Sequence, residues 1–344
     1  MSGSSESAKP LLLTMGDACG IGPEIAAAAF VADAGNADLC LVGDVGVLRR
    51  ALRFKGLDWP VAQLESPAER TSVPPRCLPV WQPEGLPADL RDAALGQIDA
   101  RAGRAAATCI EAAVAAVRRG EAAGLVTAPI HKEALHAAGV DYPGHTEMLQ
   151  ALAAENGVLP PVRMMLANEE LRTVLVTIHM SLRRAIEQLS SAGVLETIRI
   201  TDAAMRRFGI AAPRIAVSGL NPHAGEGGLF GDEEQKIISP AIAQAQAEGI
   251  DARGPYAPDT VFMRARHAPP VHPGEFDVVV SMIHDHGLIA VKYLGVEEGV
   301  NVTLGLPFVR TSPDHGTAFD IAGTGRADAS SMAAAIRMAR RLRG

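Results

Sequence analysis

Short apolar runs alternate with longer amphipathic, alanine-rich segments along this chain. The alternation is typical of α/β proteins, because strands that lie between layers of helices are apolar on both faces. The predicted strands are residues 11–15, 39–43, 124–127, 163–166, 173–178, 214–218, 276–282 and 300–304. Helices are predicted to begin near Pro23, Ala100, Glu147, Val194, Asp232 and Ala329. The proline-rich stretch 66–87 is predicted to be a surface connection.

Length and composition indicate a globular protein that binds a small molecule. The 344 residues, 48% of them hydrophobic, suffice for one large α/β unit or two lobes. The net charge of −7 is spread without long charged blocks, which argues against nucleic-acid or anionic-membrane partners. Cys19, Cys40, Cys77 and Cys109 are scattered, as expected of reduced thiols. No apolar run approaches the ~20 residues of a membrane span, so we expect a cytoplasmic protein with a loose N-terminal tail.

Polar residues lie at the ends of several predicted strands or just after them. They are Thr127, His179, the segment 221–223, and the pair His284 and Asp285. Ligands of open α/β sheets bind outside the carboxyl ends of the strands. We therefore expect the chemistry to be gathered at one edge of the sheet.

Three of these residues are histidines, His179, His223 and His284, and they form a candidate metal site. Neutral imidazole is the commonest ligand of zinc and similar ions, and three ligands leave a position open for substrate. The alternative is that each histidine is a hydrogen-bonded structural group. Three histidines at equivalent positions favour the metal hypothesis.

Two aspartates, Asp259 and Asp285, are candidates to orient these imidazoles or to hold a substrate hydroxyl. The segment Pro258-Asp259-Thr260 fits a helix cap equally well, and the sequence leaves both interpretations open.

A candidate anion site combines a predicted helix start with isolated basic residues. His145 and Thr146 precede an amphipathic helix, whose first amides and the threonine hydroxyl can receive a phosphate or carboxylate. The alternative is that Thr146 only caps that helix. Lys292, Asn301 and Arg310 surround an apolar strand, which suits an anion-binding set better than a solvated face.

Two segments of the chain are rich in glycine. The first, 16–24, joins a strand to a helix, as close backbone approach to a ligand requires, but its glycine spacing is not that of a Rossmann fold. The second runs from His315 to Gly325, and tight turns around a short helix are its structural alternative.

Taken together, these motifs resemble the 4-hydroxythreonine-4-phosphate dehydrogenase family, from Leu11 nearly to the C-terminus. The most specific segments are 15–17, 20–24, 144–147, 219–226, 284–285, 299–301, 305–307 and 314–318. The resemblance implies an α/β/α fold like that of isocitrate and isopropylmalate dehydrogenases, not a Rossmann fold. It implies a cofactor-side lobe of residues 1–135 and 306–344, and a metal, substrate and dimerisation lobe of residues 136–305. It also implies a homodimer in which the partner subunit supplies one of three metal ligands.

The resemblance carries roles onto individual residues. His179, His223 and His284 match the ligands of a divalent metal, for which zinc, cobalt, magnesium, manganese and nickel are candidates. His145, Thr146, Lys292, Asn301 and Arg310 match the substrate-binding positions. The assigned NAD or NADP positions are Gly16, Asp17, Gly20, Gly22, His315, Gly316, Thr317, Ala318, Asp320, Gly323 and Gly325.

The expected reaction is metal-dependent oxidation of a small phosphorylated hydroxy acid by NAD(P), followed by decarboxylation of the 3-oxo acid. Asp259, Asp285 and Lys292 are the candidate general bases. 4-Hydroxythreonine 4-phosphate, the pyridoxine-pathway substrate, is the first candidate. The sequence departs from the family pattern at Ala18-Cys19, where Pro-Ala is usual, and at His286, where glutamine is usual, and the second departure concerns substrate choice. Segments 142–145, 231–234 and 319–321 are closer to a sister group acting on erythronate or threonate 4-phosphate. The sequence also leaves open a cis-dihydrodiol dehydrogenase and a non-catalytic metabolite-binding protein.

Overall fold

The computed structural model describes residues 9–33, 37–295 and 297–343. The expected N-terminal tail lies outside these residues. Contacts divide the chain into unit 1, Met1–Pro160 with Leu306–Arg343, and unit 2, Pro161–Gly305. Residues 136–160, which the sequence analysis assigned to the second lobe, therefore belong to unit 1.

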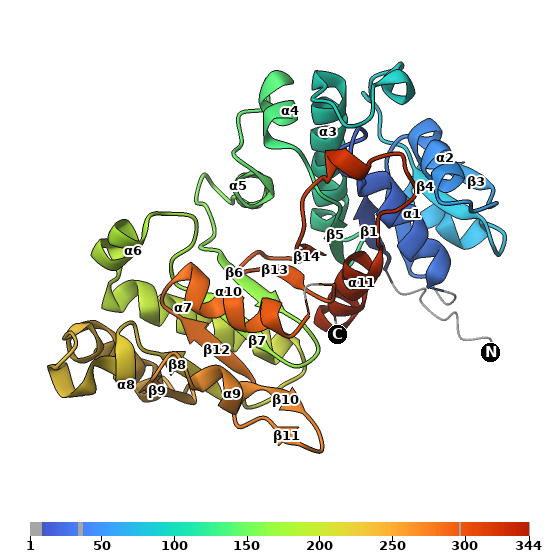
Figure 1. Cartoon of the computed structure of the whole chain (residues 1–344). Helices are drawn as coiled ribbons and strands as arrows, with labels where there is room; N and C mark the ends of the chain where they lie inside the picture. The colour runs from blue at the N-terminus through green and yellow to red at the C-terminus, as the bar shows by residue number, and fades with distance from the viewer. Residues whose placement is uncertain (1–8, 34–36, 296, 344) are drawn as a thin grey trace. The chain divides into compact units, whose positions relative to one another are not determined.

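Unit 1 contains a parallel sheet with the strand order β3-β4-β2-β1-β5-β14 (Figure 1). The strands are β1 (Leu11–Thr14), β2 (Leu39–Val42), β3 (Val61–Leu64), β4 (Leu78–Trp81), β5 (Gly124–Thr127) and β14 (Val309–Pro313). Its helices are α1 (Gly22–Ala32), α2 (Val45–Phe54), α3 (Ala100–Arg118), α4 (Lys132–Ala137), α5 (His145–Leu152) and α11 (Ser330–Leu342). Short turns of helix are η1 (Pro67–Ser72), η2 (Leu90–Asp92) and η5 (Phe319–Ile321). Strands β1, β2 and β5 are fully buried, as their apolar sequences require.

Unit 2 contains a mixed sheet with the strand order β13-β6-β7-β12-β8-β9. The strands are β6 (Arg163–Ala167), β7 (Arg172–Leu175), β8 (Ile215–Ser218), β9 (Ala252–Tyr256), β12 (Val278–Ser281) and β13 (Val300–Leu304); β6 is antiparallel to both its neighbours. A small hairpin pairs β10 (His267–Ala268) with β11 (His272–Pro273). The helices are α6 (Leu182–Gln188), α7 (Ser191–Arg207), α8 (Ser239–Ala247), α9 (Val261–Ala265) and α10 (His284–Tyr293), with η3 (Pro222–Gly228) and η4 (Glu234–Ile238). Leu166, Leu175 and Val279 belong to the apolar core.

The predicted strands agree with observed strands to within a few residues, and helices begin close to the predicted positions. The interpretation of residues 66–87 as a surface connection is wrong for β4, whose Leu78 and Val80 are fully buried between β3 and β2. Prolines misled the prediction because Pro79 occupies a strand whose apolar neighbours are buried. Helix α2 was missed as well, although Asp44 caps it by accepting a hydrogen bond from the Val47 amide.

Among the described residues, no helix is both long enough and apolar enough to cross a bilayer. Cys19, Cys40 and Cys109 are buried, Cys77 is half-buried, and all four are free thiols, as the sequence predicted. Burial raises the pKa of the Cys19 and Cys40 thiols to about 12, which leaves them protonated at neutral pH.

Candidate metal and substrate sites

His179 and His284 come together because they follow neighbouring parallel strands. Strands β7 and β12 pair from Thr173 to Leu175, and backbone hydrogen bonds continue past their ends from the amides of Val176 and Thr177. The segments that follow β7 and β12 therefore leave the sheet side by side. The imidazole centroids are 5.5 Å apart, with the rings tilted by 52°.

A carboxylate orients one of these rings. Nδ1 of His284 lies 2.7 Å from Oδ1 of Asp285. An ionised carboxylate only accepts hydrogen bonds, so a neutral imidazole in this contact carries its hydrogen on Nδ1 and has its lone pair on Nε2, the atom that can bind a metal. Both histidines and Asp285 line a cavity of about 400 Å³ together with Thr177 and His286.

His223 follows β8, the strand on the other side of β12, and so leaves the sheet at the same edge. Its loop is a left-handed turn in which six successive residues, 223–228, have positive φ angles. Such a turn is costly for residues with a Cβ, so the surrounding structure must hold it. The His223 ring is exposed and lies near Phe230, with 6.1 Å between centroids.

Glu234 is hydrogen-bonded to the residues that lead into the His223 loop. The buried carboxylate accepts hydrogen bonds from the amides of Leu220 and Asn221, both at 2.8 Å, and from the Asn221 side chain at 3.0 Å. Burial opposes ionisation of Glu234, but these hydrogen bonds outweigh it and lower the pKa of the carboxyl. The charged form is therefore the one that organises the loop.

The donor set suits a divalent metal. Two adjacent imidazoles, one of them oriented by a carboxylate, are the ligand chemistry of zinc and related ions. Within the described part of the chain, no group of three or more His, Cys, Asp or Glu side chains is arranged to hold a metal ion. The structure thus brings His179 and His284 together and leaves His223 on its own loop.

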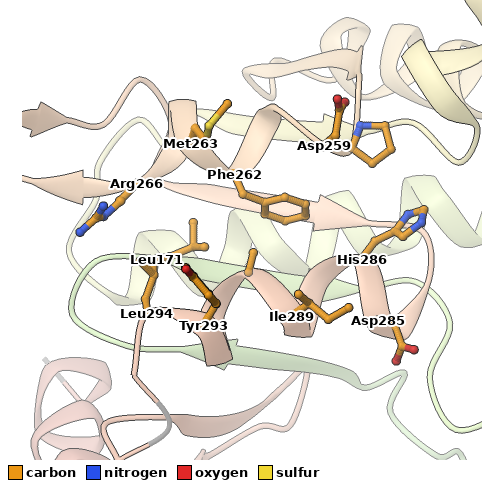
Figure 2. Close-up of a pocket in the computed structure, with 12 residues that line it drawn as sticks. Leu171, Asp259, Phe262, Met263, Arg266, Asp285, His286, Ile289, Tyr293 and Leu294 are labelled. Atoms are coloured by element: carbon orange, nitrogen blue, oxygen red, sulfur yellow. The ribbon is translucent and has the colours of Figure 1, made fainter.

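A second cavity, of about 420 Å³, lies beside this edge and shares Asp285 and His286 with the first. Figure 2 shows its two walls, one formed by Asp259, Phe262 and Met263 around α9 and the other by helix α10. Segment 258–260 supplies the N-cap residue of α9, Thr260, but no side chain caps that helix, and Asp259 lines the cavity. Burial lowers the pKa of His286, which favours its neutral imidazole.

Of the residues of unit 1 that the sequence predicts to bind an anion, Arg310 is a buried cation and His145 lies near it. Arg310 on β14 is 3% exposed and donates to the Thr127 hydroxyl from Nε at 3.2 Å and from Nη2 at 2.8 Å. Burial lowers the pKa of Arg310 to about 10, so the guanidinium stays charged at neutral pH. Burial, and then the positive charge of Arg310, lower the pKa of His145 well below its ordinary value. Nε2 of His145 is buried without a hydrogen-bond partner.

Thr146 lies in the first turn of α5, directly after His145. The N-cap of that helix is Gly144, and no side chain caps it, so the interpretation of Thr146 as a cap is wrong. The first-turn amides therefore lack a side-chain acceptor at the helix end. Lys292, on α10, and Asn301, on β13, belong to unit 2, where Lys292 lies two turns beyond Asp285.

The first glycine segment packs against protein. A Cβ at Gly16 would lie 2.4 Å from the Pro129 carbonyl oxygen, and one at Gly20 would lie 2.8 Å from that of Thr317. Gly22 is similarly close, at 2.5 Å, to the Met15 carbonyl oxygen. The close approach that requires glycine is therefore to the chain's own backbone, and contact of these residues with a cofactor stays a prediction. Burial raises the pKa of Asp17, the acceptor for the Cys19 amide, to about 6.

The second segment, 315–325, lies directly on the first. The Ile21 amide donates to the Thr317 carbonyl at 2.9 Å, and the Phe319 ring stacks on His131 with centroids 4.7 Å apart. Gly316 and Asp320 are exposed along the segment. The turn η5 partly matches the alternative of tight turns around a short helix, which is compatible with ligand binding.

Sequence reasoning missed Thr127 as the partner of Arg310, and it missed Glu234 as the support of the His223 loop. Thr127 was noted only for its place at a strand end, and Glu234 only as part of segment 231–234. No local signal identifies such partners, because each hydrogen bond joins segments far apart along the chain.

An α/β fold with a histidine pair at the strand ends is typical of an enzyme, and comparison with known proteins gives the family. Residues 36–339 match the family described as pyridoxal phosphate biosynthetic protein PdxA. The chain belongs to the PdxA family and is a dehydrogenase, a class that uses NAD(P). The family resemblance and the α/β fold class expected from the sequence are thereby confirmed.

Two curated relatives differ in the substrate that they are named for. The chain is 52% identical to 4-hydroxythreonine-4-phosphate dehydrogenase of Beijerinckia indica subsp. indica over 97% of its length and 95% of the relative. It is 44% identical to D-threonate 4-phosphate dehydrogenase of Salmonella typhimurium, covering 97% and 99% of the two chains.

Two solved structures cover nearly the whole chain. A crystal structure of 4-hydroxythreonine-4-phosphate dehydrogenase from Klebsiella pneumoniae matches with a TM-score of 0.88, 43% identity and 99% coverage of each chain. A terephthalate 1,2-cis-dihydrodioldehydrogenase from Burkholderia xenovorans LB400 matches with a TM-score of 0.67 and 30% identity, covering 97% and 98%.

Proposed function

We propose that this protein is a divalent-metal-dependent dehydrogenase that oxidises a small phosphorylated hydroxy acid with NAD(P) and then releases carbon dioxide. The observation that carries the proposal is the pair His179 and His284, oriented by Asp285 at the sheet edge where His223 also emerges. The three histidines would hold the metal. A bound divalent ion would act there as a Lewis acid, favouring ionisation of the substrate hydroxyl.

The metal site we propose is completed in a homodimer, with one histidine supplied by the partner subunit. Large apolar side chains beside the histidine-bearing helix support an interface there, because Met263, Ile289 and Tyr293 are 66%, 66% and 91% exposed. Exposed apolar residues gathered at one place are typical of protein interfaces.

The residues that would bind the phosphate and carboxylate of the substrate are His145, Thr146, Lys292, Asn301 and Arg310. Arg310 supports this role because it is a buried charge, and a bound anion offsets the cost of burying it. Both curated relatives are named for a 4-phosphate substrate.

In the chemical step, a base takes the proton of the substrate hydroxyl, and the carbon that bears this hydroxyl transfers a hydride to the nicotinamide. Decarboxylation of the 3-oxo acid then breaks the bond to the carboxylate carbon, which leaves as carbon dioxide, and the electron pair of that bond forms an enolate that takes up a proton. Asp285 is the base that we favour over Asp259 and Lys292, because it lines the histidine cavity. Residues 315–325 would bind the adenosine end of NAD or NADP.

The first-choice substrate is 4-hydroxythreonine 4-phosphate, which places the enzyme in cytoplasmic pyridoxal phosphate biosynthesis. The 52% identity to the Beijerinckia relative supports this choice. Threonate or erythronate 4-phosphate is the second candidate, supported by the Salmonella relative and by segments 142–145, 231–234 and 319–321.

The decisive experiment is NAD(P)H formation by the metal-replete enzyme with 4-hydroxythreonine, threonate and erythronate 4-phosphates side by side, each with a chelator control. We expect chelator-sensitive turnover, fastest with the amino substrate. Preference for a sugar acid would select the second candidate, and chelator-insensitive turnover would contradict the metal mechanism.

The same assay addresses two further activities. Because the chain is similar to a dihydrodiol dehydrogenase, a carboxylated diol is the next substrate to try. Such a diol carries no phosphate, so it would not need the residues proposed to bind one. Tight binding of the phosphorylated acids without any NAD(P) reduction would favour a non-catalytic binding protein.

A further inference from the structure

Two side chains outside the assigned sites fix the end of the 315–325 segment. Glu24, in the first turn of α1, is 2% exposed, and its two carboxylate oxygens accept hydrogen bonds from the amides of Gly323, at 2.6 Å, and Gly325, at 3.2 Å. Lys55, which ends α2, donates from Nζ to the carbonyls of Gly325, at 2.9 Å, and Ala327, at 2.8 Å. The backbone of residues 323–327 is thus hydrogen-bonded both to a carboxylate and to an ammonium group.

The same stretch is pressed closely against its surroundings. Gly323 and Gly325 have φ angles of 79° and 72°, the left-handed region that favours glycine. A Cβ at Gly325 would lie 2.2 Å from the Phe54 carbonyl oxygen, and one at Gly323 would lie 2.4 Å from the Leu95 side chain. This end of the segment is therefore packed closely against its surroundings, with no room for a side chain at either glycine.

Glu24 is placed to act on the segment and not on a ligand. Both its oxygens are occupied by amides of the segment, and the side chain is buried. Buried charge-assisted hydrogen bonds are strong and directional, so they hold the backbone in position before any ligand arrives.

We propose that Glu24 and Lys55 are positioning residues for the dinucleotide cofactor. By holding residues 323–327, they set the conformation in which the preceding residues, including the exposed Gly316 and Asp320, meet the cofactor. A preformed segment loses less conformational entropy on binding, so the two side chains strengthen cofactor binding without touching it. This inference rests on the proposed assignment of residues 315–325 to the cofactor.

The test measures kcat, KM for NAD, KM for the phosphorylated substrate, and the Kd of NADH by fluorescence in the full-length, metal-replete protein. For Glu24→Gln, whose amide accepts one hydrogen bond but opposes the other, we expect KM and Kd for the cofactor to rise about 10- to 100-fold. We expect kcat to stay within about threefold and substrate KM to be unchanged, because the reacting groups lie elsewhere. Lys55→Met should raise cofactor KM about fivefold, and Lys55→Arg should restore it to within about twofold, since guanidinium can donate to both carbonyls.

The matched control is Asp44→Ala, which removes the cap at the other end of α2 and leaves the 315–325 segment untouched. We expect Asp44→Ala to lower the thermal stability of the protein and to leave the KM for the cofactor at its wild-type value. Unchanged cofactor KM in both Glu24→Gln and Lys55→Met, or an equal rise in Asp44→Ala, would overturn the positioning role. If Glu24→Gln does not fold, the Lys55 pair decides. A wild-type protein that neither binds NADH nor reduces NAD would instead contradict the proposed function itself.

Discussion

The guanidinium of Arg310 donates two hydrogen bonds to the hydroxyl of Thr127, across the pair of parallel strands β14 and β5. A neutral hydroxyl fixes the orientation of the cation without cancelling its charge. The cation is buried next to His145, and burial together with that positive charge lowers the pKa of the His145 imidazole.

Arg310→Met should raise KM for the phosphorylated substrate by about 100-fold, because one charge-assisted pair with phosphate is lost. Steady-state kinetics with substrate varied at saturating cofactor is the measurement. Arg119→Met, at an exposed arginine paired with Glu121 on the surface, is the control. An unchanged substrate KM in Arg310→Met would remove Arg310 from the anion site.

Metal affinity should follow the geometry around His284. His284→Ala removes a ligand and should abolish metal binding and turnover together. Asp285→Asn should weaken metal affinity by about 10- to 100-fold, because it removes the carboxylate that orients the ring. Metal content after dialysis and titration with Zn²⁺ measure both effects. Full metal occupancy in His284→Ala would show that the histidine pair is not the metal site.

Alanine variants at two glycines of the His223 loop distinguish the effect of backbone strain from the effect of a steric clash with Glu234. Gly225 and Gly227 both have positive φ angles, but only a Cβ at Gly225 would meet Glu234, at 2.7 Å from Oε2. Both alanine variants should lose about 1 kcal/mol from the left-handed conformation. Only Gly225→Ala should also lower metal affinity, because it displaces the carboxylate that holds the loop. Urea unfolding and metal titration of the two variants are compared, and equal metal affinities would contradict the role of Glu234.

Asp17 should make stability depend on pH in the acid range. Burial raises its pKa from 3.8 to about 6, so between these values the folded state binds more protons than the unfolded state. Stability present below pH 4 is therefore lost as the pH rises toward 6, by on the order of 3 kcal/mol at about 1.4 kcal/mol per unit.

Asp17→Asn should remove that dependence, so that relative to wild type it gains stability between pH 4 and pH 7. Urea unfolding of the metal-free protein at several pH values measures it, with the exposed Asp141→Asn as the control. Parallel pH profiles of wild type and Asp17→Asn would contradict the burial argument.

Much of the fold and part of the site followed from local pattern. Buried parallel strands are apolar along their whole length, so β1, β2 and β5 could be recognised directly. The position of His179 and His284 after such strands predicted that they would meet at one edge. Strand β4 was missed because its proline is a poor strand former, and its place in the sheet depends on pairing with β2 and β3.

The sequence by itself determined the family, the α/β class and the kinds of residues at the strand ends, because motifs and hydrophobic periodicity are local properties of the chain. Only the tertiary structure decided which partners those residues meet. In the folded protein Thr127 is hydrogen-bonded to Arg310, Glu234 to the start of the His223 loop, and Glu24 to the backbone of residues 323–325. The tertiary structure also turned the glycines of the first segment toward the chain's own backbone. Such contacts join residues distant in sequence, and strand order and close packing select them, neither of which a local pattern encodes.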